Sequence, residues 1–129
     1  MPIASSLKVL IVDDQNSVRQ MTRITLEELG IRTIHEAENG KDAFQTATLQ
    51  PIDLIISDYN MPEMDGLEFL RAVRGHAALR KLPFILLTGR GDRELVVKAA
   101  QAGVNNYLVK PFTTPILREK IEQVLGKLT

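Results

Sequence analysis

The sequence has no cysteine, no net charge and no long apolar run, and each absence excludes a class of protein. Without cysteine the chain forms neither disulfides nor thiolate metal sites, and a reducing compartment suits it. The 16 Lys and Arg residues balance the 16 Asp and Glu residues, so no charge excess favours nucleic acid or a membrane surface as partner. No apolar run reaches the roughly 20 residues that span a bilayer, and the start of the chain lacks a secretion-signal pattern. We therefore expect a cytosolic protein.

Five short apolar runs alternate with five amphipathic segments in the 129 residues. The expected strands are 7–12, 32–37, 54–57, 84–87 and 106–109. The expected helices are 16–29, about 41–48, 67–74, 93–102 and 115–125, with Asp92 and Thr114 as the N-caps of the last two. We expect a single domain over 1–129 with a flexible tail at 1–6. Strict alternation predicts an α/β fold, a doubly wound five-stranded parallel sheet with five helices on its two faces.

The apolar residues of the first predicted helix and of the second predicted strand form distinct patterns. In the first helix, Val18, Met21 and Leu29 share one side, which we expect to face the core. In the second strand, His35 and Glu36 interrupt the apolar run and weaken the prediction.

Polar residues follow four of the five predicted strands. Asp13 and Asp14 end the first strand, Asp58 the third, Thr88 the fourth and Lys110 the fifth. Ligands of such sheets bind beyond the carboxyl ends of the strands. Taken singly, an Asp before a helix is most often a cap, and a Thr after a strand a turn residue. Their joint placement at one edge favours a functional site.

These residues predict phosphate chemistry. Three carboxylates placed close together repel one another, and a hard divalent cation relieves that repulsion. An all-oxygen ligand set favours Mg²⁺ over Zn²⁺. Lys110 and Thr88 can neutralise and hydrogen-bond a phosphoryl group. Asp58, on the most central strand, is the best candidate for a nucleophile that forms an acyl phosphate.

Five segments resemble the receiver domains of bacterial two-component systems. They are VDD (12–14), SDYNMPEMDGLEFL (57–70), LTG (87–89), AQAG (100–103) and YLVKPF (107–112). Among receivers, the chain looks most similar to the chemotaxis regulators of the CheY type. The resemblance implies a flavodoxin-like fold with the strand order 2-1-3-4-5 known for that type.

The resemblance also implies a role for each matching residue of the acidic site. Asp58 is the phosphoacceptor. Asp14 and Asp58 bind Mg²⁺ directly, Asn60 binds it through its backbone carbonyl, and Asp13 acts through water. Lys110 contacts the phosphoryl oxygens, and the bond before Pro111 is cis.

Further residues are implied to report the phosphorylation. Thr88 is the switch hydroxyl and Tyr107 the switch aromatic, although a half-buried strand tyrosine is a common structural residue. The partner-binding surface is expected on the fourth helix, fifth strand and fifth helix. On it we place Arg93, Val96, Tyr107, Phe112 and Lys120.

Some positions depart from the CheY pattern or suggest other partners. Gln15 and Arg90 are expected at the rim of the acidic site; Arg90 is either a solvated loop residue or an influence on donor access and acyl-phosphate lifetime. A mildly basic edge is interpreted as a solvated face, with an anionic partner as the lesser alternative. Its members are Arg71, Arg74, Arg80 and Lys81.

Three functions follow as hypotheses. The first is a stand-alone, monomeric response regulator phosphorylated by a histidine kinase, which then docks to a target such as a flagellar motor switch component. The second is a phosphate sink that drains a shared kinase. The third is a Mg²⁺-dependent phosphatase or phosphotransferase. Haloacid-dehalogenase phosphatases place Asp-x-Asp after the first strand, whereas Asp13 and Asp14 are adjacent here.

Overall fold

Strands and helices alternate along the chain in the computed structural model, which describes residues 2–89 and 93–129. The elements in chain order are η1 (Ala4–Ser6, a 3-10 helix), β1 (Lys8–Val12), α1 (Asn16–Glu28), β2 (Thr33–Ala37), α2 (Gly40–Leu49), β3 (Leu54–Asp58), α3 (Gly66–Gly75), β4 (Phe84–Thr88), α4 (Arg93–Gln101), β5 (Asn106–Val109) and α5 (Thr114–Leu125). The predicted fold class is confirmed, and the predicted boundaries lie within one residue of these.

All five strands are parallel and lie in the order β2-β1-β3-β4-β5. β3 and β4 are buried at every position, as expected for central strands whose two faces are covered by helices. The chain leaves β1 in one direction to form β2 and crosses to its other side to form β3. Ligand sites of such sheets lie where the strand order reverses, which here is between β1 and β3.

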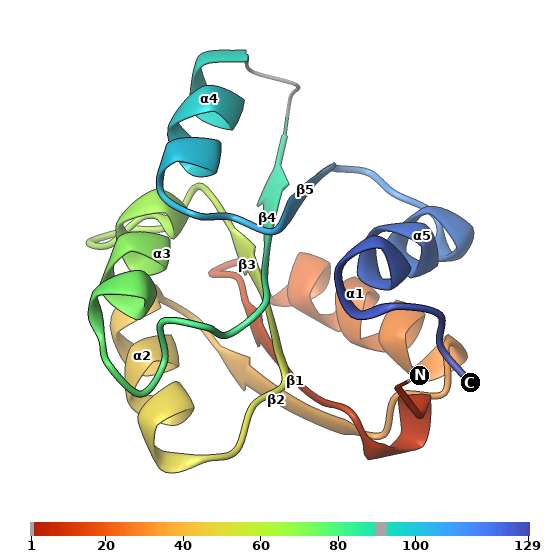
Figure 1. The fold of residues 1–129 in the computed structure, drawn as a ribbon. Helices are drawn as coiled ribbons and strands as arrows, with labels where there is room; N and C mark the ends of the chain where they lie inside the picture. The colour runs from red at the N-terminus through yellow and green to blue at the C-terminus, as the bar shows by residue number, and fades with distance from the viewer. Residues whose placement is uncertain (1, 90–92) are drawn as a thin grey trace.

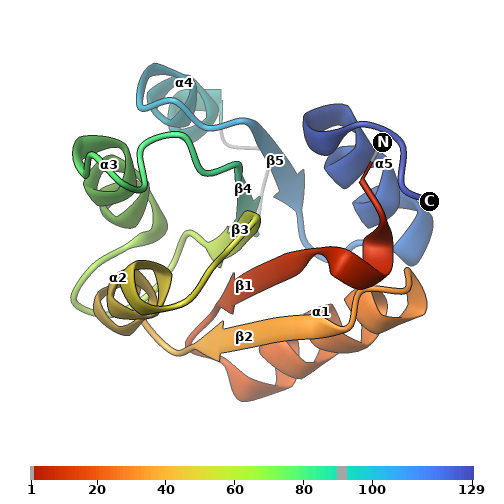
Figure 2. The ribbon, with the colours of Figure 1, turned by 60° about the horizontal axis from the view of Figure 1, so that its bottom comes forward.

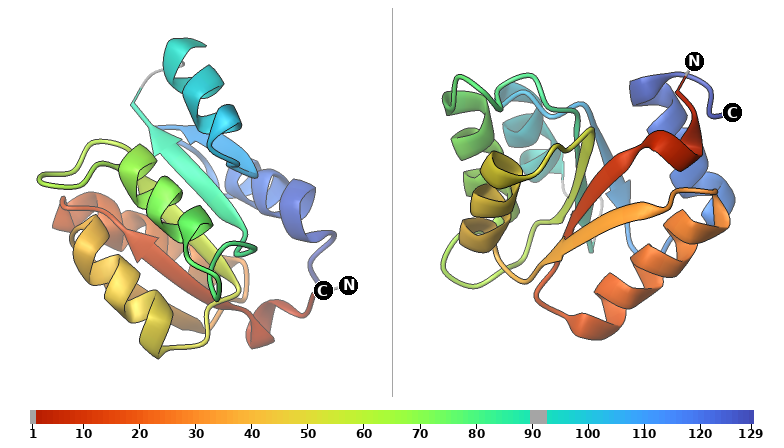
Figure 3. Two further views of the ribbon diagram at one scale, coloured as in Figure 1. Left: turned by 60° about the vertical axis from the view of Figure 1, so that its left-hand side comes forward. Right: turned by 90° about the horizontal axis from the view of Figure 1, so that it is seen from below.

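Two layers of helices cover the sheet (Figure 1). One cluster of buried apolar side chains lies between the sheet and α2, α3 and α4. A second cluster lies between the sheet and α1 and α5. Both views in Figure 3 show this division of the five helices between the two faces.

Side-chain caps start three of the helices. Asn39 accepts a hydrogen bond from the backbone N–H of Asp42 at α2. Asp65 and Glu68 form a reciprocal capping box at α3, which sequence inspection missed. The α5 cap is Thr113 rather than the predicted Thr114, because the Thr113 hydroxyl accepts from Ile116 N–H. Asp92, the predicted α4 cap, lies outside the described residues.

The buried side of α1 differs from the prediction. Its buried residues are Arg19, Thr22 and Leu26. Met21 is 65% exposed, and Val18 is only half-buried. Leu29 packs against the second core cluster, as expected. The prediction is wrong for Met21 because it followed the apolar residues, whereas the helix turns an arginine inward.

The two ends of the chain lie together (Figures 2 and 3). Ala4 N–H donates to Thr129 O at 3.2 Å, and Thr129 N–H donates to Pro2 O at 3.1 Å. Ala4 is buried in the same cluster as Leu7. Ala4 is therefore held against the domain, whereas Ser5 and Ser6 are exposed, and the flexible tail over the rest of 1–6 stays a prediction. Across residues 2–89 and 93–129, no helix is both long and apolar enough to traverse a bilayer.

Candidate functional site

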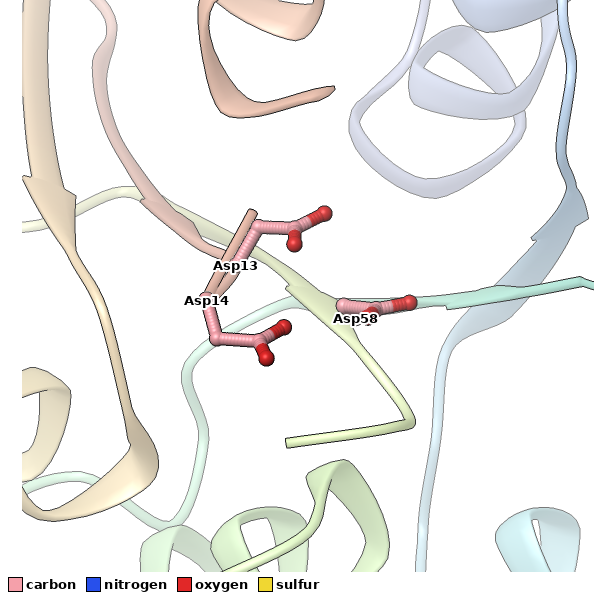
Figure 4. Close-up of side chains that lie close together, drawn as sticks. All are labelled: Asp13, Asp14 and Asp58. Atoms are coloured by element: carbon pink, nitrogen blue, oxygen red, sulfur yellow. The ribbon is translucent and has the colours of Figure 1, made fainter. Parts of the chain in front are cut away.

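Three aspartates meet at the carboxyl ends of β1 and β3 (Figure 4). Asp13 and Asp14 follow β1, and Asp58 is the last residue of β3. One carboxylate oxygen from each lies within 4.8 Å of the other two. Asp13 and Asp58 are buried at 0% and 4% exposure, whereas Asp14 is exposed. The structure thus brings together the three acidic residues that the strand ends predict.

The backbone and one carboxylate oxygen of Asp13 are fixed by its surroundings. Its N–H donates to Ala37 O at 3.1 Å, which ties it to the end of β2. Its Oδ1 accepts from Gln15 N–H at 2.9 Å. Its buried Oδ2 has no hydrogen-bond partner in the described part of the chain. This atom is a buried acceptor that lacks the partner such groups normally have.

Lys110 brings the compensating positive charge from the end of β5. Its Nζ lies 2.9 Å from Asp58 Oδ1 and 3.8 Å from Asp13 Oδ2. Its own N–H donates to Thr88 O at 2.7 Å, which fixes its backbone to the end of β4. The Lys110–Pro111 bond is cis, as the resemblance implied.

The two buried carboxylates, Asp13 and Asp58, both have a raised pKa, and burial is the main cause. Burial raises the pKa of Asp13, and the nearby Asp58 charge adds to that rise against the opposing Gln15 hydrogen bond. Burial also raises the pKa of Asp58 by more than its contacts with Lys110 lower it. In both residues the ionised form is therefore penalised.

The site suits a hard divalent cation. Its donors are carboxylate oxygens alone, the type that Mg²⁺ prefers. The buried Oδ2 of Asp13, which has no hydrogen-bond partner in the described part of the chain, is an acceptor that such a cation would satisfy. The carbonyl of Asn60 stays a prediction as a further ligand.

Thr88 and Tyr107 lie on the same face of the sheet. Tyr107 pairs with Leu86 in the β4–β5 register, and Leu86 is two residues before Thr88, so the three side chains point to one side. Thr88 is buried at 2% exposure. Tyr107 is half-buried and packs against the cluster under α2, α3 and α4. Both side chains therefore lie on the face of the sheet that α2, α3 and α4 cover.

The structure brings together two residues of the predicted partner surface, Tyr107 and Lys120, and the surface as a whole stays a prediction. Lys120 Nζ lies over the Tyr107 ring, 5.2 Å from its centroid. Arg93 and Val96 stand on α4, exposed and half-buried respectively. Phe112 instead packs in the cluster under α1 and α5. Its inclusion in the surface is therefore wrong.

Pro111 and Phe112 line a pocket together with Lys110, Gln15 and four residues of α1. Lys110 contacts Asp58, and Gln15 N–H donates to Asp13. Gln15 therefore lies at the rim of the acidic site, as predicted. Arg90 lies outside the described residues, so its two interpretations stay open.

The interpretation of Arg74 as part of a solvated basic face is also wrong. Its guanidinium donates to the backbone oxygens of Gly103, Arg80 and Leu82 and to Asn105 Oδ1. It joins the end of α3 to the segments that lead into β4 and β5.

The response regulator receiver domain family matches residues 9–122 of this chain. The chain belongs to this family. A receiver is a signalling domain rather than a classical enzyme, and receivers bind Mg²⁺ at an acidic pocket. In this chain Asp13, Asp14 and Asp58 form an acidic group that could hold a metal ion.

Similar proteins bear CheY names. A Rhizobium etli protein named "Probable chemotaxis protein CheY" is 48% identical, with 99% of each chain covered. A Campylobacter jejuni protein named "Chemotaxis protein CheY homolog" is 43% identical, with 93% of each covered. The solved structure of the chemotaxis response regulator CheY4 of Vibrio cholerae is 38% identical and has a TM-score of 0.85, with 92% of this chain and 98% of that one covered. These relatives confirm a CheY-like receiver.

Sequence inspection missed an ion-pair group behind the acidic site. Arg19 of α1 and Glu36 of β2 are joined at 2.8 Å, and Arg23 reaches the other Glu36 oxygen at 2.7 Å. Burial alone would raise the pKa of Glu36, but hydrogen bonds from Arg19 and Arg23 outweigh it and hold the pKa below its ordinary value. Glu36, a charged residue inside the apolar run of β2, is the feature of the sequence that indicates this ion pair. On the strand pattern alone it predicts only a weaker strand.

Proposed function

We propose that Asp58 accepts a phosphoryl group from a histidine kinase in a Mg²⁺-dependent reaction, and that the modification changes which partner the domain binds. The observation that carries this proposal is the convergence of three carboxylates and Lys110 at the end of β3. Asp58 is the residue of that group that contacts the lysine most closely, at 2.9 Å.

The chemistry is an in-line transfer to a carboxylate. An Asp58 oxygen attacks phosphorus, an O–P bond forms, and the N–P bond of the phosphohistidine breaks. The electron pair leaves with the imidazole nitrogen, which takes a proton from solvent. When bound, Mg²⁺ supplies charge neutralisation at the phosphoryl oxygens. Asp14, Asp58 and the Asn60 carbonyl would hold the ion directly, and Asp13 through water.

Lys110 has two successive tasks in this scheme. Before transfer, its ammonium pairs with Asp58 and offsets part of the acidic charge. After transfer, the same ammonium can pair with a phosphoryl oxygen, which carries more charge than the carboxylate it replaces. Thr88 then hydrogen-bonds the phosphoryl group, and Tyr107 turns inward behind it. The surface that reports this change comprises Arg93, Val96, Tyr107 and Lys120.

The names of the relatives support a role in chemotaxis. On that basis the partners are a chemotaxis histidine kinase and a flagellar motor switch component. The domain is proposed to act in the cytoplasm as a monomer, without nucleic acid or membrane as a partner.

The test is incubation with acetyl phosphate and MgCl₂, followed by intact-protein mass spectrometry. The expected result is addition of one phosphoryl group to wild type and none to Asp58→Asn. Asp53→Asn is the matched control, because Asp53 precedes the opposite end of β3 and caps Lys8 N–H instead. A wild type that stays unmodified at saturating Mg²⁺, or an Asp58→Asn variant that is modified, would contradict the proposal.

The target can be tested separately. Phosphorylated wild type should be retained by an immobilised flagellar switch protein, and the unphosphorylated protein should not. Phosphorylation without retention would favour the phosphate-sink function instead.

A further inference from the structure

Arg19 is a buried arginine at the start of α1, with 7% of its surface exposed. Its guanidinium is directed at three different partners. Nη1 donates to the backbone oxygen of Asp13 at 2.7 Å. Nε donates to Glu36 Oε1 at 2.8 Å, and Nη2 to Asn16 Oδ1 at 2.8 Å.

Glu36 holds this guanidinium in place from β2. In the β1–β2 register it pairs with Ile11, two residues before Asp13. Its Oε1 also accepts from Gln20 Nε2 at 2.9 Å, and its Oε2 accepts from Arg23 Nη1 at 2.7 Å. The Glu36 carboxylate is thus bound by three side chains of α1, so it fixes the rotation of the helix relative to β2.

The contact with Asp13 fixes the peptide that joins the two acidic residues. Asp13 N–H is bound by Ala37 O, and its carboxylate by Gln15 N–H. Arg19 takes the remaining backbone group, the carbonyl, which belongs to the peptide plane between Asp13 and Asp14. Because a peptide is planar, fixing its carbonyl oxygen also sets the direction in which Asp14 leaves.

A buried arginine is a costly way to stabilise a helix. Ion pairs inside proteins often contribute no more than apolar side chains of similar size, because charges lose their hydration on burial. A methionine or leucine at this position of α1 would serve packing. What an apolar side chain could not supply is a donor for the Asp13 carbonyl.

We propose that Arg19, held by Glu36, is a positioning residue that sets the Asp13–Asp14 peptide and thereby the affinity of the acidic site for a divalent cation. This inference rests on the proposed Mg²⁺ site. Residues that orient metal ligands typically change metal affinity 10- to 100-fold when they are replaced. We expect Arg19 to act within that range.

The test measures the dissociation constant for MgCl₂ by calorimetry, together with unfolding by urea in a chelator. Arg19→Met should weaken Mg²⁺ binding about 10-fold, measured where the protein is fully folded. Glu36→Gln should weaken it by a smaller factor, because it frees the guanidinium without removing it. Arg19→Lys should lie between wild type and Arg19→Met, because an ammonium can reach only some of the three partners.

Arg74→Met is the matched control, because Arg74 also donates to backbone oxygens but lies at the other end of the sheet. It should lower stability and leave the Mg²⁺ affinity within twofold of wild type. The inference is overturned if Arg19→Met binds Mg²⁺ as wild type does, or if Arg74→Met weakens binding equally. If Arg19→Met does not fold, wild-type affinity in both Arg19→Lys and Glu36→Gln overturns it. A wild type that binds no Mg²⁺ would remove the proposed site itself, a result distinct from these.

Discussion

Two arginines at opposite ends of the sheet donate hydrogen bonds from their guanidinium groups to backbone carbonyl oxygens. Arg74 lies at the amino ends of β4 and β5, and Arg19 lies at the carboxyl end of β1. Within residues 2–89 and 93–129, the hydrogen bonds of the Arg74 guanidinium go to neutral oxygens, and Asn105 Oδ1 accepts from it and from Phe84 N–H. Around Arg19 the neighbouring Asp13 keeps an unpartnered buried oxygen. The hydrogen bonds of Arg74 at the amino ends of β4 and β5 therefore serve stability.

The carboxyl end also holds backbone strain. Glu63, in the loop after β3, has φ of 68°, the one positive value for a non-glycine residue among those the structure describes. Such strain and unbalanced charge are typical of functional sites, whose stability is offset by the rest of the fold. An arginine that donates to backbone carbonyl oxygens therefore stabilises the loops at one end of the sheet and lies beside a candidate ligand site at the other. Four substitutions test this division.

The largest effect is expected for Gly66→Ala at the start of α3. A Cβ at Gly66 would collide with the backbone oxygen of Asp58 and lie 2.9 Å from Tyr59 Cα. We expect a loss of about 3 kcal/mol in unfolding free energy, together with weaker Mg²⁺ binding. Gly75→Ala at the other end of α3 is the control, since nothing lies within 4 Å of its Cβ. Equal urea midpoints for the two variants would contradict the close packing of the β3–α3 loop.

Arg74→Met should cause the largest loss at the amino end. It removes the donors for Gly103 O and Leu82 O while keeping an apolar stem of similar length. Because part of this site is exposed to water, the expected cost is about 2 kcal/mol in urea unfolding. A cost below about 0.5 kcal/mol would mean that water replaces the guanidinium.

Asp13→Asn should have the opposite sign and stabilise the Mg²⁺-free protein by about 1 kcal/mol at neutral pH. Because the folded-state pKa values of Asp13 and Asp58 are raised, the native state binds more protons than the unfolded state. The contribution of these two groups to stability should therefore rise as the pH falls from neutral toward 3.8, their ordinary pKa, whereas Glu36, whose pKa is lowered, contributes in the opposite direction.

The measurement is urea unfolding across this pH range in a chelator, for wild type and Asp13→Asn. The difference in unfolding free energy between Asp13→Asn and wild type should shrink as the pH falls, and Asp53→Asn should follow wild type. A difference that stays constant or grows over this interval would contradict the expected sign.

Glu63→Gly should give the smallest effect, a gain of about 0.5 kcal/mol, because glycine adopts positive φ without the steric cost of a Cβ. Glu63→Ala keeps the Cβ and removes only the charge, so its unfolding free energy should stay at the wild-type value. If Ala stabilises as much as Gly, the effect comes from charge and the strain at this position is negligible.

The sequence predicted the fold and the acidic site well because both follow from local patterns. Strict alternation of elements defines a parallel sheet, and a parallel sheet collects its strand ends at one edge. Asp13, Asp14, Asp58 and Lys110 each stand within two residues of the end of an apolar run, so their meeting required no knowledge of long-range packing.

The failures concern side chains whose partners come from distant segments. Arg19 is buried because the β1–β2 register places Glu36 beside α1, and the periodicity of α1 alone favours Met21 as the inward residue. Phe112 faces α1 rather than α4 because of the path of the β5–α5 loop. Strand and helix patterns contain no information on either contact.

The hydrogen bond from Lys110 N–H to Thr88 O has one more consequence. With its main chain tied to the neighbouring strand at 2.7 Å, the lysine can follow a charge that moves away from Asp58 only by rotating its side-chain bonds. The ammonium can therefore change partner while β5 stays in register.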